Sequence, residues 1–139
     1  MGATTTPQAE MDRLIAAHYR AEVAGDSAAA VAMFAPDIEH DAVGAPRVSH
    51  GPAEAAAFYA ELFADLAFDR LTPRRRLYGD HFCVDEALVE ARAIGRPFGR
   101  EGRGRPVRFR LLHIFEFADG RITRENAWLD LAAIDRQLA

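Results

Sequence analysis

The chain has 139 residues, half of them hydrophobic, which suits one domain with an ordinary buried core. Its formal net charge of −4, with 17 basic residues that are all arginine, argues against a general nucleic-acid partner. A single cysteine, Cys83, excludes an internal disulfide and a cysteine-rich zinc site. The lack of a long apolar run or signal-peptide pattern predicts a soluble cytoplasmic protein with no membrane partner.

The N-terminal half is expected to be mainly helical. A loose tail over 1–6 precedes a domain over 7–139. Prolines and an aspartate cap, together with helical spacing of apolar residues, predict three helices at 7–24, 27–34 and 52–66. A short strand is expected at 38–43.

The C-terminal half changes to the period of strands. Four strands are predicted at 74–83, 84–95, 106–118 and 121–130, followed by a short helix at 131–138. Asp119-Gly120 predicts a tight hairpin between the last two strands. The Gly- and Arg-rich segment 95–106 is expected to be a mobile loop, such as a pocket lid, and Arg74-Arg75-Arg76 a solvated strand edge. Helices followed by an antiparallel meander give an α+β fold.

The predicted strand 107–117 carries the strongest functional signal. Its inward face alternates apolar residues with one histidine, His113. A buried imidazole must be paired, and its charge state responds to its neighbours. His113 is either a hydrogen-bonded core residue or part of a site that it shares with His18 and Asp41.

Several motifs resemble a known superfamily. Resemblance to ketosteroid isomerases rests on Val23-Ala24-Gly25-Asp26, Met33-Phe34-Ala35-Pro36-Asp37, and His50-Gly51 followed by Ala57-Phe58-Tyr59. Resemblance to SnoaL-like polyketide cyclases rests on 104–107, 117–122, 128–130 and 137–138. Both belong to the nuclear transport factor 2-like superfamily. The resemblance implies one cone-shaped α+β domain, with three N-terminal helices on a curved, mostly antiparallel sheet, and a homodimer formed through the outer face of that sheet.

The resemblance also implies catalytic residues. Asp41 matches the place of the isomerase general base, and His18 and His113 match the places of its two oxyanion donors, with Tyr19 one residue from the first. The cyclases use a His/Asp pair, for which His113 and Asp130 are the match here. Structural alternatives stay open: Asp41 and Asp130 are also placed to cap a turn and the last helix, and His18 to pack in the core.

The side chains expected to bind substrate are mostly aromatic: Tyr19, Phe58, Phe115, Trp128 and Asn126. Trp128 is either pocket wall or core, and it shares a strand face with Asn126 and Asp130. Glu39 and Asp41 share one face of their strand, and His40 takes the other. Histidine spacing is poor for a metal, so none is expected.

These residues predict a cofactor-independent acid/base enzyme that acts on a carbonyl-containing apolar small molecule, of isomerase or polyketide-cyclase type. One alternative is a non-catalytic module for apolar ligand binding or dimerisation. Another is an epoxide hydrolase of the same fold, echoed by Arg92 and Asp130, although a cross-strand ion pair on the outer face explains Arg92 better.

Overall fold

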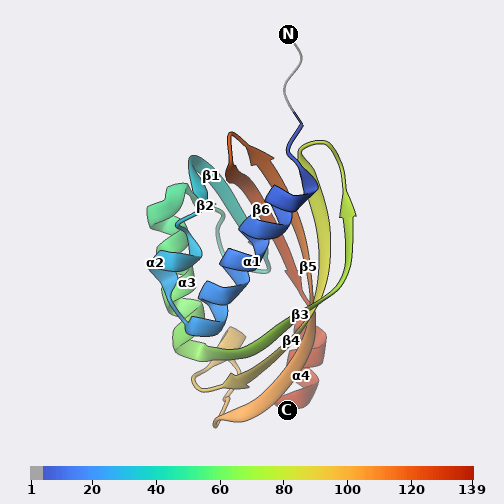
Figure 1. Cartoon of the computed structure of the whole chain (residues 1–139). Coiled ribbons are helices and arrows are strands. Elements are labelled where there is room, and N and C mark those ends of the chain that lie inside the picture. Colours follow the sequence, from blue (N-terminus) through green and yellow to red (C-terminus); the bar gives the residue numbers. More distant parts are fainter. Residues whose placement is uncertain (1–4) are drawn as a thin grey trace.

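A six-stranded sheet curves around the N-terminal helices in the computed structural model, which describes residues 5–139 (Figure 1). The strand order is β2-β1-β6-β5-β4-β3. All neighbouring strands are antiparallel except β1 and β6, which are parallel. The fold is therefore α+β with a mostly antiparallel sheet, as predicted.

The helices are α1 (Gln8–Ala24), α2 (Ser27–Ala30), α3 (Gly51–Asp65) and α4 (Leu131–Gln137), with a short 3₁₀ turn η1 (Pro97–Gly99). The strands are β1 (Phe34–Val43), β2 (Ser49–His50), β3 (Leu66–Tyr78), β4 (Phe82–Ala93), β5 (Arg105–Ala118) and β6 (Arg121–Leu129). The helices α1, α2 and α3 lie on the concave side of the sheet, and α4 packs near its lower end (Figure 1).

Several expected boundaries are wrong, and the strand expected at 38–43 already begins at Phe34. The second helix ends at Ala30 instead of residue 34, because Phe34 is buried at the start of β1 and belongs to the sheet. The strand expected at 74–83 begins eight residues earlier, at Leu66, and the turn into β4 lies at Gly79 instead of after Cys83. Charged residues and Pro73 interrupt the apolar alternation of β3, which hid its true extent.

The tight hairpin expected between the last two strands is confirmed. Asp119 and Gly120 both have positive φ, 51° and 73°, as a tight hairpin between β5 and β6 requires. Cys83 is buried, and burial raises the pKa of its thiol to about 12. Of the loose tail expected over 1–6, residues 1–4 lie outside the described residues, while Thr6 donates its backbone N–H to the carbonyl of Asp80. Within residues 5–139, no helix is long and apolar enough to cross a membrane.

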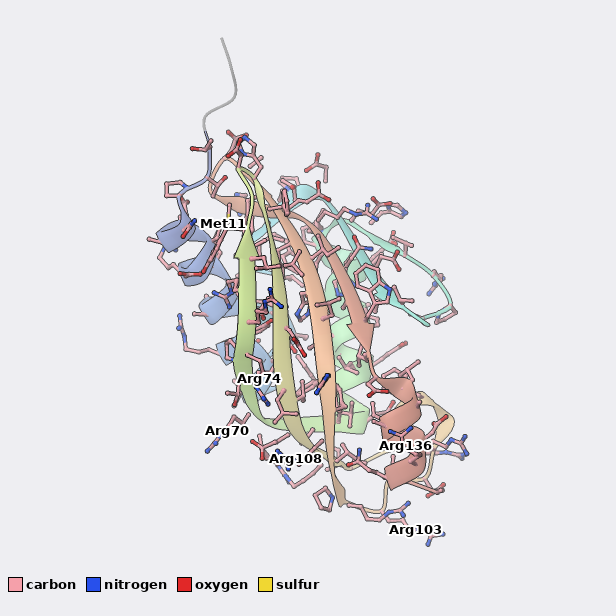
Figure 2. All side chains as sticks on the ribbon, turned by 90° about the vertical axis from the view of Figure 1, so that its right-hand side faces the viewer. Met11, Arg70, Arg74, Arg103, Arg108 and Arg136 are labelled. Carbon is pink, nitrogen blue, oxygen red and sulfur yellow. The ribbon has the colours of Figure 1, made fainter. Side chains whose placement is uncertain are left out.

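The outer face of the sheet carries paired charges (Figure 2). Arg110 lies 3.8 Å from Glu86 across β4 and β5, and Arg92 lies 3.1 Å from Asp69 across β3 and β4. The cross-strand ion pair expected at Arg92 is therefore confirmed. Arg76 departs from the expected solvated edge, because it turns inward to hydrogen-bond Asp85. The homodimer expected through this face stays a prediction.

The buried core falls into two apolar clusters separated by polar side chains. One cluster lies under α1 and includes Met11, Ile15 and Phe115. The other lies toward α4 and includes Phe109 and Ile134. On β5 the inward row runs from Phe115 through His113 to Leu111, so the histidine sits where the clusters meet.

Candidate active site

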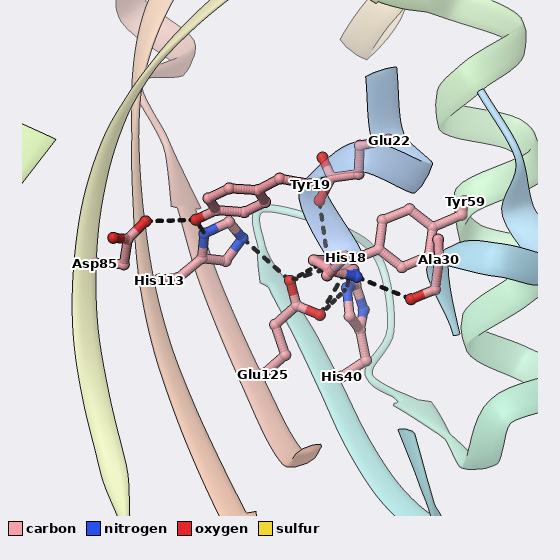
Figure 3. A network of polar contacts seen from close by, with 9 residues as sticks. All are labelled: His18, Tyr19, Glu22, Ala30, His40, Tyr59, Asp85, His113 and Glu125. Atoms are coloured by element: carbon pink, nitrogen blue, oxygen red, sulfur yellow. Dashed lines mark hydrogen bonds and ion pairs between the residues drawn. The ribbon is translucent and has the colours of Figure 1, made fainter. Parts of the chain in front are cut away.

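Glu125 is the centre of a fully buried polar network inside the cone (Figure 3). It lies on β6, and its carboxylate faces three imidazoles. Oε1 is 3.2 Å from Nε2 of His18 and 3.1 Å from Nε2 of His113, and Oε2 is 3.7 Å from Nε2 of His40. Tyr59 donates its hydroxyl to both carboxylate oxygens, at 3.2 and 3.1 Å.

This surrounding keeps Glu125 ionised. Burial alone would raise its pKa, but the charge of His18 and hydrogen bonds from His113 and His18 hold the pKa well below 4.5. A buried carboxylate is tolerated only when such partners replace its lost hydration. The site therefore holds a fixed negative charge between two apolar clusters.

His18 is the cationic partner of this carboxylate. Its Nδ1 donates to the carbonyl of Ala30 at 2.8 Å, and its Nε2 lies 2.9 Å from Glu22 Oε1. Both nitrogens face acceptors, so both must carry protons. Burial lowers the pKa of His18, but the attraction of Glu125 and Glu22 outweighs it and holds the pKa well above 6.5.

His40 differs from the other two histidines. It is 2% exposed, and its Nδ1 has no hydrogen-bond partner among residues 5–139. Its Nε2 lies 3.0 Å from the hydroxyl of Tyr59. The hydroxyl of Tyr59 donates its one proton to Glu125, so Nε2 of His40 must carry a proton and donate it to the hydroxyl oxygen of Tyr59. Burial lowers the pKa of His40 below 6.5, so the ring is neutral at neutral pH. Its one proton is on Nε2, which leaves Nδ1 bare, that is, without a proton.

His113 closes the network on the opposite side. Its Nδ1 is 2.9 Å from the hydroxyl of Tyr19, and Tyr19 donates at 2.5 Å to Asp85. Phe115 stacks against its ring with centroids 4.6 Å apart. Burial, reinforced by Asp85, raises the pKa of Tyr19 well above 10, so Tyr19 stays a phenol.

The network borders a small apolar cavity that opens toward a larger groove. The inner cavity has a volume of about 40 Å³, and its polar lining comes from Glu22, His40, Tyr59, His113 and Glu125. The outer groove measures about 790 Å³ and runs between α3 and the loops at 44–48 and 97–98. The two spaces adjoin, because they share four lining residues, namely Ala45, Phe58, Leu62 and Phe98.

Phe98 is placed at this junction by a strained turn. Its φ is 54°, which is rare for an aromatic residue, and its side chain is 45% exposed. It belongs to the segment 95–106 in which a pocket lid was expected. Strained backbone of this kind concentrates at ligand-binding segments.

Several predicted site residues do come together. His18, His113 and Tyr19 belong to the buried network, and Phe58 lines both the cavity and the groove. Phe115 lies behind His113 in the core. The choice between His18 and Tyr19 does not arise, since both side chains are buried and face inward.

Four predicted site residues lie elsewhere, and their expected placement in the pocket is wrong. Asp41 points away from the network, because His40 occupies the inward position of β1, and Asn126 donates to Asp41 at 3.4 Å on the other face. Trp128 is 39% exposed on that same outer face. Asp130 caps α4 through the N–H of Ala133 at 3.1 Å.

A bulge in β6 explains the error for Asn126 and Trp128. Phe117 pairs with Ile122 and Glu116 pairs with Arg124, so Thr123 is an extra residue in the ladder. Ile122 and Glu125 therefore both face inward although they are three positions apart, and every later residue of the strand changes face.

Sequence reasoning missed five members of the network: Glu22, His40, Tyr59, Asp85 and Glu125. The alternation of β1 offered one usable signal, since Ile38, His40 and Ala42 form its apolar face. Glu125 offered none, because its inward orientation depends on the bulge. Within residues 5–139, no group of three or more His, Cys, Asp or Glu side chains is arranged to hold a metal ion.

The cone of helices on a curved sheet is the fold of the nuclear transport factor 2-like superfamily, with the polar network in its interior. A SnoaL-like domain model matches residues 15–125, and the chain belongs to this family. No curated protein matches the sequence.

Three solved structures illustrate the likeness. TsrD from Streptomyces laurentii superposes with a TM-score of 0.83 at 21% identity, covering 96% of this chain and 98% of its own. A proposed SnoaL-like polyketide cyclase from Jannaschia sp. CCS1 gives 0.81 at 18% identity, over 99% and 97%. An LEH-like epoxide hydrolase from M. tuberculosis gives 0.72 at 20% identity, over 94% and 90%. At these identities, the likeness establishes the fold.

Proposed function

We propose that the chain is a cofactor-independent acid/base enzyme that acts next to the carbonyl group of an apolar small molecule, by isomerisation or ring closure. One observation carries the proposal. His40 presents a bare, buried ring nitrogen without a partner among the described residues, beside an ionised carboxylate and an apolar cavity. A neutral imidazole with a free nitrogen is a general base.

The proposed reaction begins with proton abstraction. Nδ1 of His40 takes the proton from the carbon next to the carbonyl, the C–H electron pair forms a C=C bond, and the carbonyl π pair moves to oxygen. The resulting imidazolium donates through Nε2 to Tyr59, which donates in turn to Glu125. The fixed negative charge of Glu125 thus stabilises the positive charge that develops on His40.

The enolate oxygen needs a hydrogen-bond donor. His113 lines the same cavity, and its Nε2 lies 3.1 Å from Glu125 Oε1. Because Glu125 is ionised, this nitrogen carries the proton between them. We assign the Nε2–H of His113, shared between Glu125 and the substrate oxygen, as donor to the enolate oxygen. The reaction then ends either by return of the proton from His40 to another carbon, or by attack of the enolate carbon on a second carbonyl, whose oxygen receives the carbonyl π pair and then the proton from His40.

The two connected spaces favour a substrate with a reactive end and a larger body. The inner cavity of about 40 Å³ admits little more than one functional group, whereas the outer groove of about 790 Å³ falls in the range of small-molecule sites, roughly 300–1,000 Å³. The carbonyl would enter past Phe98 and Phe58, and the apolar body would lie against them.

Proton exchange at carbon tests the proposal without knowledge of the natural substrate. Wild-type protein is incubated in D₂O with 2-tetralone and related bicyclic ketones, and loss of the α-proton signal is followed by NMR. We expect exchange above the buffer rate, and a fall of roughly a hundredfold or more in His40→Gln, which keeps a polar side chain but has no base. Binding of the ketones without any exchange would instead favour a non-catalytic binding module.

The epoxide hydrolase alternative finds no support in its residues. Arg92 pairs with Asp69 on the outer face, and Asp130 caps α4, so neither faces the cavity. Asp41 also lies on the outer face of the sheet, so it takes no part in the proposed reaction.

A further inference from the structure

Asp85 is a fully buried carboxylate that the proposed reaction does not use. It lies on the inner face of β4, directly opposite His113 on β5. It does not touch Glu125 or the cavity; its carboxylate oxygens contact Arg76 and Tyr19. A buried carboxylate loses its hydration, and hydrogen bonds from partners such as Arg76 and Tyr19 must replace it.

Arg76 fixes one oxygen of Asp85. Its Nε donates to Asp85 Oδ1 at 2.8 Å, and its NH1 donates to Asp12 Oδ1 at 2.6 Å. Tyr78 also donates to Asp12, at 2.6 Å. The guanidinium is thus held between α1 and β4, and it can only donate. Oδ1 of Asp85 is therefore an acceptor for Arg76, which leaves Oδ2 for Tyr19.

The hydroxyl of Tyr19 then has only one possible role toward His113. It carries a single proton, which it donates to Asp85 Oδ2 at 2.5 Å. Toward Nδ1 of His113, 2.9 Å away, its oxygen can only accept. Nδ1 of His113 must therefore carry a hydrogen. The tautomer of a histidine is commonly set in this way by the hydrogen bond of its other nitrogen.

From this chain of contacts we propose that Arg76, Asp85 and Tyr19 are positioning residues that fix the proton of His113 on Nδ1. Nε2 is then the one nitrogen of His113 that can gain or lose a proton, and it faces Glu125 and the cavity. The catalytic consequence rests on the proposed function above; the fixed proton on Nδ1 does not.

Asp85→Asn offers a direct test, because it reverses the direction of the hydrogen bonds that run from His113 through Tyr19 to residue 85. The amide oxygen must accept from Arg76, so the amide NH₂ faces Tyr19 and donates to its oxygen. Tyr19 then turns its proton to Nδ1 of His113, which must become bare. The variant keeps the shape of Asp85 and predicts that Nδ1 of His113 carries no proton.

The measurement is a two-bond ¹H–¹⁵N correlation spectrum of protein labelled at its histidines, with His113 assigned by its absence in His113→Gln. In wild type we expect Nδ1 of His113 to give a protonated, pyrrole-type signal. In Asp85→Asn it should change to a pyridine-type signal. Glu86→Gln is the matched control, since it alters the neighbouring outward residue of β4 and should leave the spectrum unchanged.

A pyridine-type Nδ1 in wild type overturns the proposal, as does an unchanged signal in a folded Asp85→Asn protein. If Asp85→Asn does not fold, Tyr19→Phe replaces it. Removal of the hydroxyl leaves Nδ1 without an acceptor, so Nε2, which donates to Glu125, should keep its proton and Nδ1 should lose the one it carries. Retention of the pyrrole-type Nδ1 in Tyr19→Phe contradicts the proposal equally.

Ketone exchange separates this inference from the proposed function. If both hold, Asp85→Asn lowers the exchange rate at saturating ketone and leaves the KM unchanged. If wild type shows the protonated Nδ1 but exchanges no ketone, the proposed function fails and the positioning role stands.

Discussion

Nε2 of His18 lies 3.2 Å from Oε1 of Glu125, a contact between two fully buried side chains from α1 and β6 that are 107 residues apart in sequence. It joins the first helix to the last strand at the centre of the cone. The cation and the carboxylate stabilise each other there only because each has further partners.

Glu125→Gln should destabilise the fold strongly. Glutamine keeps the volume but removes the charge that holds the surrounding imidazoles, and breaking a buried ion pair typically costs roughly 3–5 kcal/mol. Urea unfolding at pH 7 measures the loss. Glu116→Gln, an exposed change on the adjacent strand, should stay within about 0.5 kcal/mol of wild type. Equal stabilities of the two variants would contradict the central role of Glu125.

Stability should also depend on pH through His18. Because the folded-state pKa of His18 is raised well above 6.5, its contribution is fully present below pH 6.5 and is lost as the pH rises through the folded pKa. His18→Gln should therefore flatten the decline of unfolding free energy on the alkaline side. His50→Gln, at an exposed position, is the control. A decline that persists unchanged in His18→Gln would place its origin elsewhere.

The carboxylate of Glu125 should make the unfolding free energy depend on pH on the acidic side. Its folded-state pKa is held well below 4.5, so its contribution is present above pH 4.5 and is lost as the pH falls through the folded pKa. Wild type should lose unfolding free energy on acidification from pH 5, and Glu125→Gln should lose less over the same range. A parallel acid limb in the two proteins would show that other carboxylates produce it.

Asp130 should matter for stability alone. Its side chain caps α4, so Asp130→Ala should cost about 1 kcal/mol, whereas Asp130→Asn should recover most of that loss. Thermal melts measure both variants. Ketone exchange should be unchanged in each, and a large loss of exchange in a normally stable Asp130→Asn protein would restore the His113/Asp130 pair of the cyclase-like hypothesis.

The sequence predicted the fold well where local signals were strong. Pro7 and Gly25 bounded α1, and Asp119-Gly120 defined the last hairpin. The single histidine in the apolar row of β5 correctly indicated that His113 faces inward. These features depend on residues close in sequence, which is why a single chain reveals them.

The remaining site residues depend on register. Alternation assigned His40 and Asp41 to opposite faces, and only the apolar neighbours Ile38 and Ala42 indicated that the face of His40 is the buried one. The extra residue at Thr123 then exchanged the faces of Glu125 and Asn126. A bulge of one residue has no reliable signal in sequence, and it moves every later side chain of the strand to the other face.

The neighbours His40 and Asp41 provide the most direct test of the account, since they occupy opposite faces of β1. Ketone α-proton exchange is measured for wild type, His40→Gln and Asp41→Asn, with thermal melts to verify folding. The account predicts a loss of roughly a hundredfold or more in His40→Gln and no change in Asp41→Asn. Normal exchange in a folded His40→Gln protein, with exchange lost in Asp41→Asn, would contradict it and return the base to Asp41.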